Sequence, residues 1–208
     1  MKAYIYTGGK IFPEYITESP KSEDLVIAAD SGYKNSKLCG VKPNILIGDF
    51  DSIGEVPSDV EEVLQMPPEK DLTDTQLAVE VAIERGADEI VIISGTDGRL
   101  DHTLSNLAIL EGLWNRNIRC VLTSGQNRVR YIKNSGHILL REKNFKYFSV
   151  IACDSVVKGV SIKGAKYPLN NLKLTKNLQY AVSNEIDGNC SLITVKRGGV
   201  YIIESRDI

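Results

Sequence analysis

The sequence predicts a two-domain α/β protein: an N-terminal parallel-sheet α/β domain with helices on both faces, followed by a C-terminal all-β sandwich domain. Up to about Gly125, short continuous apolar runs alternate with helix-like segments. Such runs are typical of strands that are buried on both faces of a parallel sheet. After Gly125, strand-like runs follow one another at nearly regular intervals between Gly, Asn, Pro and Asp turns. This spacing favours a sandwich or a small barrel.

The first domain is expected over residues 1–125. Its predicted strands are the apolar runs at residues 4–6, 25–28, 45–47, 90–93 and 120–122. A helix is predicted from Thr73 to Arg85, where Asp71 or Thr73 can cap the start and Gly86 can end the last turn. A second helix is predicted from about Asp101 to Arg116, because apolar residues recur there at helical spacing.

A domain boundary is expected between Gly125 and Asn134, and the second domain is expected over residues 134–208. The strand-like runs that follow Gly125 are residues 131–132, 137–140, 147–151, 156–162, 179–182, 192–195 and 200–203. Their number and spacing are the basis for the all-β prediction.

Composition narrows the functional classes. The 208 residues are 42% hydrophobic and 25% charged, which is ordinary for a globular protein. A net charge of -2 without a long lysine or arginine run argues against nucleic-acid binding through a broad basic face. The four scattered cysteines indicate reduced thiols rather than disulfides or a zinc site. The apolar stretch Ala3–Tyr6 is too short for a signal sequence or a membrane span, so we expect a cytoplasmic protein without a membrane partner.

Seven aspartates at or near predicted turns are the most informative feature of the chain: Asp30, Asp49, Asp51, Asp71, Asp74, Asp97 and Asp101. Carboxylates at this density repel one another unless a cation lies between them. Oxygen ligands beside small residues suit Mg²⁺, which typically binds one or two carboxylates together with substrate phosphates. The sequence therefore predicts a metal-dependent phosphoryl-transfer enzyme.

The predicted topology brings several of these carboxylates to one edge of the sheet. Asp30, Asp49 and Asp97 each follow a predicted strand closely. Ligands of open parallel sheets bind outside the carboxyl ends of the strands. Both predicted helices direct their N-termini to the same edge, where backbone N–H groups and the positive end of the helix dipole favour phosphate.

Two pairs of aspartates are candidate metal ligands. Asp49 and Asp51 are two residues apart, so in an extended chain both carboxylates share a side and can reach one cation. Asp71 and Asp74 are either further metal ligands or helix caps. Capping explains one of these two acids well, and metal ligation accounts for both together with the first pair.

The segment from Gly95 to His102 is a predicted strand-to-helix loop whose glycines let the backbone approach a phosphate. Arg99 can make a two-pronged contact with phosphate oxygens, or it can be the ion partner of a helix-capping Asp101. Thr7–Lys10 is a similar glycine loop, or only a turn. The chain has no Gly-x4-Gly-Lys-Ser/Thr sequence, so a nucleotide would be held without a Walker A loop.

Taken together, these segments resemble the bacterial thiamine pyrophosphokinase family. The matching segments run in family order across nearly the whole chain: Ala29–Gly32, Pro43 with Gly48–Ser52, Lys70–Asp74, Gly95–His102 with Asn106, and Ser183–Glu185. The resemblance implies an α/β catalytic domain that binds ATP and Mg²⁺, and a β-sandwich domain that binds thiamine and forms a homodimer. Its active site would lie between the first domain of one subunit and the second domain of the other. The implied reaction transfers the terminal diphosphate of ATP to the hydroxyethyl oxygen of thiamine and releases AMP.

The resemblance also implies roles for particular residues. Asp49, Asp51 and Asp74 correspond to the Mg²⁺ ligands. The nucleotide and phosphate surroundings correspond to Asp30, Ser31, Lys70, Arg99, Asp101 and Asn106. The thiamine side corresponds to Asp51, Asp74, Ser183 and Asn184. The implied catalytic set is Asp71, Asp74, Arg99 and Asp101, in which Arg99 stabilises charge on the transferred group and either Asp71 or Asp101 orients the alcohol.

One departure from the family pattern concerns the acceptor. Some family members place a tryptophan near the thiamine ring, whereas the sole tryptophan here, Trp114, lies in the first domain. Three other functions stay open beside this one: a diphosphokinase of similar architecture that uses a pterin alcohol, a Mg²⁺-dependent nucleotide hydrolase, and a nucleotide or thiamine sensor without turnover. The density of carboxylates argues against the sensor, because binding alone needs fewer repelling groups.

Overall fold

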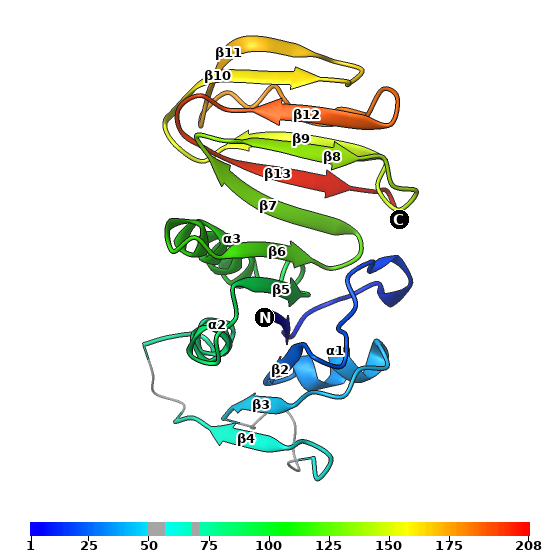
Figure 1. The fold of residues 1–208 in the computed structure, drawn as a ribbon, viewed down its shortest axis with the longest axis vertical. Helices are drawn as coiled ribbons and strands as arrows, with labels where there is room; N and C mark the ends of the chain where they lie inside the picture. Colours follow the sequence, from blue (N-terminus) through cyan, green and yellow to red (C-terminus); the bar gives the residue numbers. More distant parts are fainter. Residues whose placement is uncertain (50–56, 68–70) are drawn as a thin grey trace. The chain divides into compact units, whose positions relative to one another are not determined.

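The computed structural model describes residues 1–49, 57–67 and 71–208. The chain divides into two compact units, Met1–Gly125 and Gln126–Ile208 (Figure 1). None of the helices in these described segments is both long and apolar enough to cross a membrane.

The first unit contains a parallel sheet. Its strands are β1 (Lys2–Tyr6), β2 (Leu25–Ala29), β3 (Ile45–Gly48), β4 (Glu62–Gln65), β5 (Glu89–Ile93) and β6 (Arg119–Thr123). They lie in the order β4-β3-β2-β1-β5-β6, and every adjacent pair is parallel. The helices are η1 (Pro13–Tyr15), α1 (Gly32–Leu38), α2 (Asp74–Glu84) and α3 (Leu100–Asn115).

Helices cover both faces of this sheet, as Figure 1 shows with α1 on one side and α2 and α3 on the other. Tyr33 of α1 packs against Ala28 and Leu46 on the first face. From β2 to β3 the chain moves away from β5, whereas from β4 to β5 and β6 it moves in the opposite direction. Because crossovers between parallel strands are right-handed, this reversal puts α2 and α3 on the opposite face from α1. The α/β architecture predicted for this part of the chain is confirmed.

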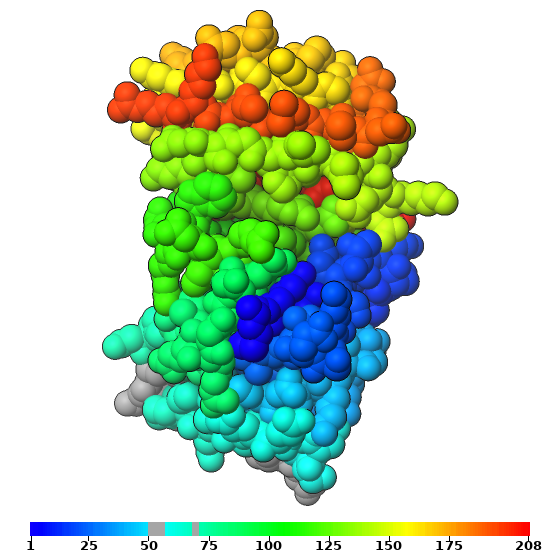
Figure 2. Space-filling view, viewed as in Figure 1, coloured from blue at the N-terminus to red at the C-terminus, as the bar shows by residue number. Residues whose placement is uncertain are grey.

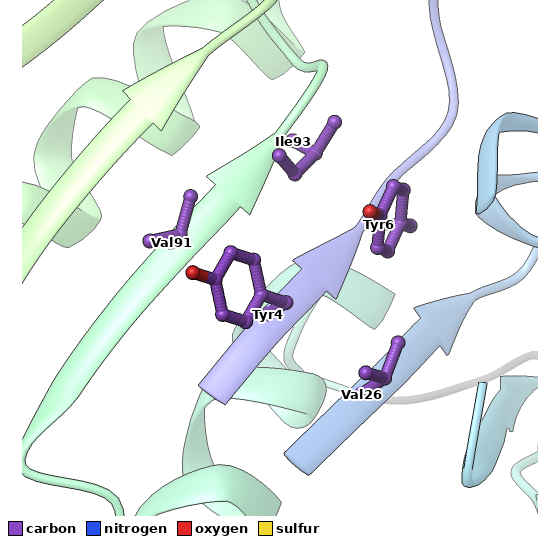
Figure 3. Close-up of a cluster of buried hydrophobic side chains, with 5 residues drawn as sticks. All are labelled: Tyr4, Tyr6, Val26, Val91 and Ile93. Carbon is purple, nitrogen blue, oxygen red and sulfur yellow. The ribbon is translucent and has the colours of Figure 1, made fainter. Parts of the chain in front are cut away.

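Alternate residues of the central strands form the core on the first face. Tyr4, Tyr6, Val26, Val91 and Ile93 are all buried and point to the same side of β1, β2 and β5 (Figure 3). Their neighbours in sequence are buried on the other face, as expected for strands with a helix layer on each side. In the space-filling view the first residues, in dark blue, lie between segments coloured blue and green, which agrees with the central position of β1 (Figure 2).

The five strands and two helices predicted in this unit are all present, but α1 and β4 were not predicted. The buried residues of α1 are Gly32, Asn35 and Ser36, so the helix has no apolar stripe that a sequence pattern could reveal. The short strand β4 pairs with β3 alone among the described strands and alternates only between exposed and half-buried residues.

Helix α2 begins with a capping box. The Thr73 hydroxyl accepts a hydrogen bond from the Gln76 backbone N–H at 3.2 Å, and the Gln76 side chain accepts one from the Thr73 backbone N–H at 2.9 Å. Of the two predicted caps, Asp71 and Thr73, the helix therefore uses Thr73. At the other end Gly86 has a φ of +89°, and its N–H donates to the Ile83 carbonyl at 2.9 Å, as predicted for a terminating glycine.

Thr73→Ala is expected to lower the free energy of unfolding by about 1 kcal/mol, because it leaves an N–H group of the first turn without its acceptor. Urea denaturation followed by circular dichroism measures the change. Thr73→Ser keeps the hydroxyl and is the matched control, which should stay close to the parent protein. Equal losses in both variants would assign the effect to the threonine methyl group rather than to the cap.

The second unit consists of antiparallel strands: β7 (Asn127–Lys133), β8 (Gly136–Leu140), β9 (Tyr147–Ala152), β10 (Val156–Lys163), β11 (Leu169–Thr175), β12 (Cys190–Thr194) and β13 (Gly199–Ser205). One sheet contains β7-β13-β9, and the other has the order β11-β10-β12-β8. Apolar side chains from both sheets are buried, among them Phe148, Val150, Ile162, Ile193 and Ile202. The all-β nature predicted for this part of the chain is confirmed.

A buried ion network joins the neighbouring strands β7 and β13. Arg128 of β7 lies directly opposite Glu204 of β13. Their side chains are only 5% and 4% exposed, and Arg128 Nη2 lies 2.7 Å from Glu204 Oε1. Arg128 also pairs with Glu142 at 2.6 Å, and Arg130 pairs with Glu204. Each buried charge therefore has an opposite charge beside it, as a buried ion requires.

The strand predicted at residues 179–182 is wrong, and the strand β11 was not predicted. The Gln179 side-chain amide takes the place of a backbone rung: Ala152 N–H donates to Gln179 Oε1 at 3.0 Å, and Gln179 Nε2 donates to the Ala152 carbonyl at 3.1 Å. The segment thus runs beside β9 without forming a ladder of its own. Strand β11 is polar and mostly exposed, and Asn171 within it has a φ of +52°, so its sequence does not read as a strand.

Candidate functional site

Glycine loops and helix N-termini of the first unit surround a cleft of about 330 Å³ at the carboxyl edge of the sheet. Its lining comes from the loops after β1, β2 and β5 and from the beginnings of α2 and α3: Thr7, Gly8, Gly9, Ala29, Asp30, Ser31, Thr73, Asp74, Thr75, Gly95, Asp97, Gly98, Arg99, His102 and Asn106. From β1 the chain continues to β2 on one side, and from β5 it continues to β6 on the other side, so the direction of the strand order reverses between β1 and β5. Such a switch point is where open α/β sheets bind ligands.

Three of the predicted aspartates, Asp30, Asp74 and Asp97, line this cleft. Asp30 directly follows β2 and has a φ of +47°, a left-handed conformation that aspartate adopts more readily than most residues other than glycine. Its backbone N–H donates to the Ile47 carbonyl at 2.7 Å, which fixes this turn to the end of β3. Asp74 is the first residue of α2, so its side chain lies at the positive end of the helix dipole.

The other predicted aspartates lie around the cleft or outside it. Asp49 directly follows β3 and is half-buried, but it is not among the lining residues. A Cβ atom on the preceding Gly48 would lie 3.3 Å from the Asp30 Cα atom, so the ends of β2 and β3 are in close contact. Asp71 is exposed and precedes α2. Asp51 and Lys70, which the sequence also assigned to this site, lie outside the described residues.

The described residues supply oxygen ligands without completing a metal site. Within the described segments, no three His, Cys, Asp or Glu side chains come together as a metal-binding group. Asp49 and Asp74 remain as carboxylates of the predicted metal set near this edge of the sheet. An oxygen-only donor set of one or two carboxylates fits Mg²⁺ when substrate phosphates provide the remaining ligands.

Arg99 and Asp101 form an ion pair at the start of α3. Arg99 Nη2 lies 2.6 Å from Asp101 Oδ2, and Arg99 Nε donates to Asp101 Oδ1 at 3.2 Å. The guanidinium hydrogen bond holds the pKa of the Asp101 carboxyl below its usual range. Arg99 is the N-cap residue of α3 without a side-chain capping bond, and Asp101 lies inside the first turn. Asp101 Oδ1 also accepts a hydrogen bond from the His102 backbone N–H of this turn at 2.9 Å. The predicted ion pair is therefore present, although Asp101 is not the N-cap residue, and the contact of Arg99 with phosphate stays a prediction.

Asn106 is buried and supports the loop after β5 rather than lying free in the cleft. Its Nδ2 atom donates to the Gly95 carbonyl at 3.0 Å. Gly95 has a φ of +83°, and a Cβ atom there would lie 2.4 Å from Asn106 Nδ2. Only glycine fits this loop position, because any side chain would displace the amide that holds it.

Two further buried residues that the sequence analysis missed support the loop after β1. Asn35 of α1 donates to the Thr7 and Gly9 carbonyls at 2.7 and 3.0 Å. Ser94 Oγ donates to the Gly8 carbonyl at 2.8 Å. An asparagine in a short polar helix and a serine after a strand carry no distinguishing pattern, so their roles emerge only from the fold.

In the second unit, Ser183 and Asn184, which the resemblance assigns to the thiamine side, form a polar corner. Asn184 is buried, and its side chain pairs with the backbone of Tyr167: Oδ1 accepts from the Tyr167 N–H at 3.0 Å, and Nδ2 donates to the Tyr167 carbonyl at 2.8 Å. Ser183 is exposed and has a φ of +56°. The following residues, Glu185 and Ile186, line a cavity of about 530 Å³. The predicted contact of this corner with thiamine stays a prediction.

Comparison with family models matches both units. Residues 16–122 match the model of the thiamin pyrophosphokinase catalytic domain. Residues 136–200 match the model of the thiamin pyrophosphokinase vitamin B1 binding domain.

Relatives and solved structures agree with these matches. Thiamine pyrophosphokinase of Bacillus subtilis (strain 168) is 30% identical over 210 residues, which cover 98% of each chain. Thiamin pyrophosphokinase 1 of Caenorhabditis elegans is 28% identical over 171 residues, covering 78% of this chain and 70% of the relative. The crystal structure of thiamine pyrophosphokinase from Bacillus subtilis superposes with a TM-score of 0.88 at 29% identity, with all of both chains covered. A thiamin pyrophosphokinase family protein from Enterococcus faecalis gives a TM-score of 0.84 at 26% identity, again over the whole of both chains.

Proposed function

The chain belongs to the thiamine pyrophosphokinase family, and from this membership we infer that it is a thiamine diphosphokinase. The reaction transfers the terminal diphosphate of ATP to the hydroxyethyl oxygen of thiamine and releases AMP. The observation that carries the proposal is the cleft at the switch point of the sheet, where glycine loops and the N-termini of two helices meet Asp30, Asp74 and Asp97. Helix N-termini and glycine loops bind phosphate, and carboxylates hold the cation that accompanies it.

We propose that Asp49, Asp51 and Asp74 hold Mg²⁺ at this edge. Their oxygen atoms are the ligand type that Mg²⁺ prefers. When bound, the cation would neutralise charge on the phosphate oxygens and make the attacked phosphorus more electrophilic. The described part of this set, Asp49 at the end of β3 and Asp74 at the start of α2, belongs to the sheet edge that forms the cleft.

The bond changes in the transfer require little activation of the nucleophile. The thiamine hydroxyl oxygen forms a bond to the β-phosphorus, and the bond from that phosphorus to the oxygen bridging to the α-phosphorus breaks, so AMP leaves with the electron pair. The hydroxyl proton passes to a base or to solvent. Positioning and charge stabilisation account for most of the rate in such reactions.

Arg99 is proposed to stabilise charge on the transferred diphosphate. Its exposed guanidinium now pairs with Asp101, and a diphosphate offers the same two-pronged oxygen geometry. Exchanging the carboxylate for phosphate would release Asp101 from the guanidinium and remove the largest cause of its lowered pKa. Either Asp101 or Asp71 would then orient the alcohol and accept its proton.

The thiamine side and the assembly are also part of the proposal. We propose that Ser183 and Asn184 contact thiamine, since they belong to the unit that matches the vitamin B1 binding domain model. We further propose a cytoplasmic homodimer whose site combines the first unit of one subunit with the second unit of its partner. Sedimentation of the purified protein would test the dimer: a monomer that turns over thiamine at full rate would contradict the shared site.

The decisive experiment mixes the purified protein with thiamine and Mg-ATP and separates the nucleotide and thiamine products. AMP appearing in step with thiamine diphosphate is the expected result, and chelation of the metal should abolish it. ADP with thiamine monophosphate would mean transfer of the wrong phosphorus. No thiamine-dependent loss of ATP would contradict the proposal, and hydroxymethylpterin and water would then be tested as acceptors.

A further inference from the structure

The loop after β1 is fixed from its interior side by buried side chains. Three consecutive carbonyl groups, those of Thr7, Gly8 and Gly9, accept hydrogen bonds. Asn35 Nδ2 donates to the first and third at 2.7 and 3.0 Å, and Ser94 Oγ donates to the second at 2.8 Å. Asn35 is 6% exposed and Ser94 is fully buried, so both donors lie inside the protein.

Peptide geometry then fixes the direction of the N–H groups in this loop. In a trans peptide unit the C=O and N–H bonds point in opposite directions. Because the Thr7 carbonyl points to Asn35, the Gly8 N–H points away from the interior. The Gly9 N–H likewise points away from Ser94. Gly8 and Gly9 both line the cleft, so these backbone donors are presented on its side.

The loop packs closely against the loops after β2 and β5, which leaves little room for a side chain at Gly8 and requires glycine at Gly9. A Cβ atom on Gly8 would lie 2.3 Å from Ser31 Oγ. Gly9 has a φ of +108°, and a Cβ atom there would lie 2.9 Å from Ser94 Oγ and 3.0 Å from the Asp97 carbonyl oxygen. The two residues therefore present N–H groups without a side chain to shield them, which is the arrangement of an anion-binding nest.

We propose that the backbone N–H groups of Gly8 and Gly9 form a binding site for the phosphates of the nucleotide, and that Asn35 and Ser94 are its positioning residues. The inference rests on the proposed function and adds residues that the aspartate motifs do not include. It also explains how a cleft lined by aspartates can bind an anion. Asp30, Asp74 and Asp97 repel a polyphosphate, and backbone donors attract it without adding a cation that these carboxylates would bind instead.

The test separates phosphate binding from nucleoside binding. Calorimetry measures the affinity of the full-length protein for ATP and for inorganic tripolyphosphate. Ligand-observed NMR measures its affinity for adenosine. Asn35→Asp replaces the Nδ2 amide group, which donates to the Thr7 and Gly9 carbonyls, by a carboxylate oxygen. Repulsion between this oxygen and the two carbonyl oxygens should rotate the peptide units of the loop. We expect affinity for ATP and for tripolyphosphate to fall about tenfold or more in parallel, with adenosine unchanged.

Asn44→Asp is the matched control. Asn44 also supports backbone in this unit, since its Oδ1 accepts from the Val26 N–H at 2.9 Å, but it lies at the opposite end of the sheet from the cleft. An aspartate there keeps this acceptor and loses only an exposed donor bond to Glu61 of 3.4 Å, so all three affinities should match the parent protein. If Asn35→Asp does not fold, Ser94→Ala removes one donor with a smaller change and should weaken ATP and tripolyphosphate alike.

The outcomes distinguish the inference from the proposed function. Folded variants that bind tripolyphosphate as tightly as the parent protein would overturn the nest, and so would a parallel loss of adenosine, because it would indicate general collapse of the cleft. A parent protein that binds neither ATP nor tripolyphosphate would overturn the proposed function and the nest together.

Discussion

Asp74→Asn is expected to lower turnover at saturating Mg-ATP and thiamine by about two to three orders of magnitude. The substitution keeps the shape of the side chain and removes one negative charge from the proposed cation site. Asp74 is the first residue of α2 and lines the cleft in which the phosphates are proposed to bind. The start of α2 is held by Thr73 and Gln76, and the fold should therefore survive.

Circular dichroism and product assays across a Mg²⁺ titration measure this effect. Asp59→Asn is the matched control, because Asp59 pairs with Lys37 and Tyr33 and is not among the residues lining the cleft. The control should turn over like the parent protein. Near-normal turnover of Asp74→Asn at low Mg²⁺ would remove Asp74 from the metal site.

Gly32→Ala is expected to lower the free energy of unfolding by more than about 3 kcal/mol or to prevent folding. A Cβ atom on Gly32 would lie 2.0 Å from the Tyr6 carbonyl oxygen, 2.5 Å from its carbon and 2.8 Å from the Thr7 Cα atom. All three are backbone atoms at the end of the central strand β1, so no side chain can rotate to make room. Relief would require α1 to move away from the sheet, which would also disturb the cleft.

Urea denaturation compares this variant with Gly112→Ala. Gly112 lies inside α3, and a Cβ atom there would meet nothing within 4 Å. That control should gain about 0.5–1 kcal/mol, because alanine is the better helix former. A Gly32→Ala protein as stable as its parent would mean that α1 does not approach β1 as closely as described.

The elements that the sequence revealed are those whose stability comes from apolar burial. The strands β1, β2, β3, β5 and β6 are continuous apolar runs because helices cover both faces of their sheet. Helix α1 was not predicted, because two features without a sequence pattern hold it against the sheet. Gly32 lets the helix approach the backbone of β1 closely, and Asn35 makes polar contacts with the loop after β1. Close backbone packing of this kind depends on a distant strand, and no local pattern encodes it.

The same distinction applies to the candidate site. Asp30 and Asp97 could be placed at the cleft because each follows a strand of a parallel sheet, and the topology brings strand ends together. The supporting roles of Asn35, Ser94 and Asn106 depend on which carbonyl each meets across the fold. In the second unit, the side-chain amide of Gln179 pairs with the backbone of Ala152 of β9. The segment around Gln179 has a strand-like sequence, but this side-chain pairing takes the place of strand hydrogen bonds.

The conformation of Asp30 has a consequence for how this protein can change. Aspartate tolerates a φ of +47° better than most side chains do, but glycine adopts it without any steric cost, so the backbone at this position has a modest preference for glycine. Selection for heat resistance alone would drive the position toward glycine, whereas selection for turnover would retain the carboxylate in the cleft. Asp30 thus marks a trade-off between stability and activity, and libraries that pass through the two selections separately should diverge at this position.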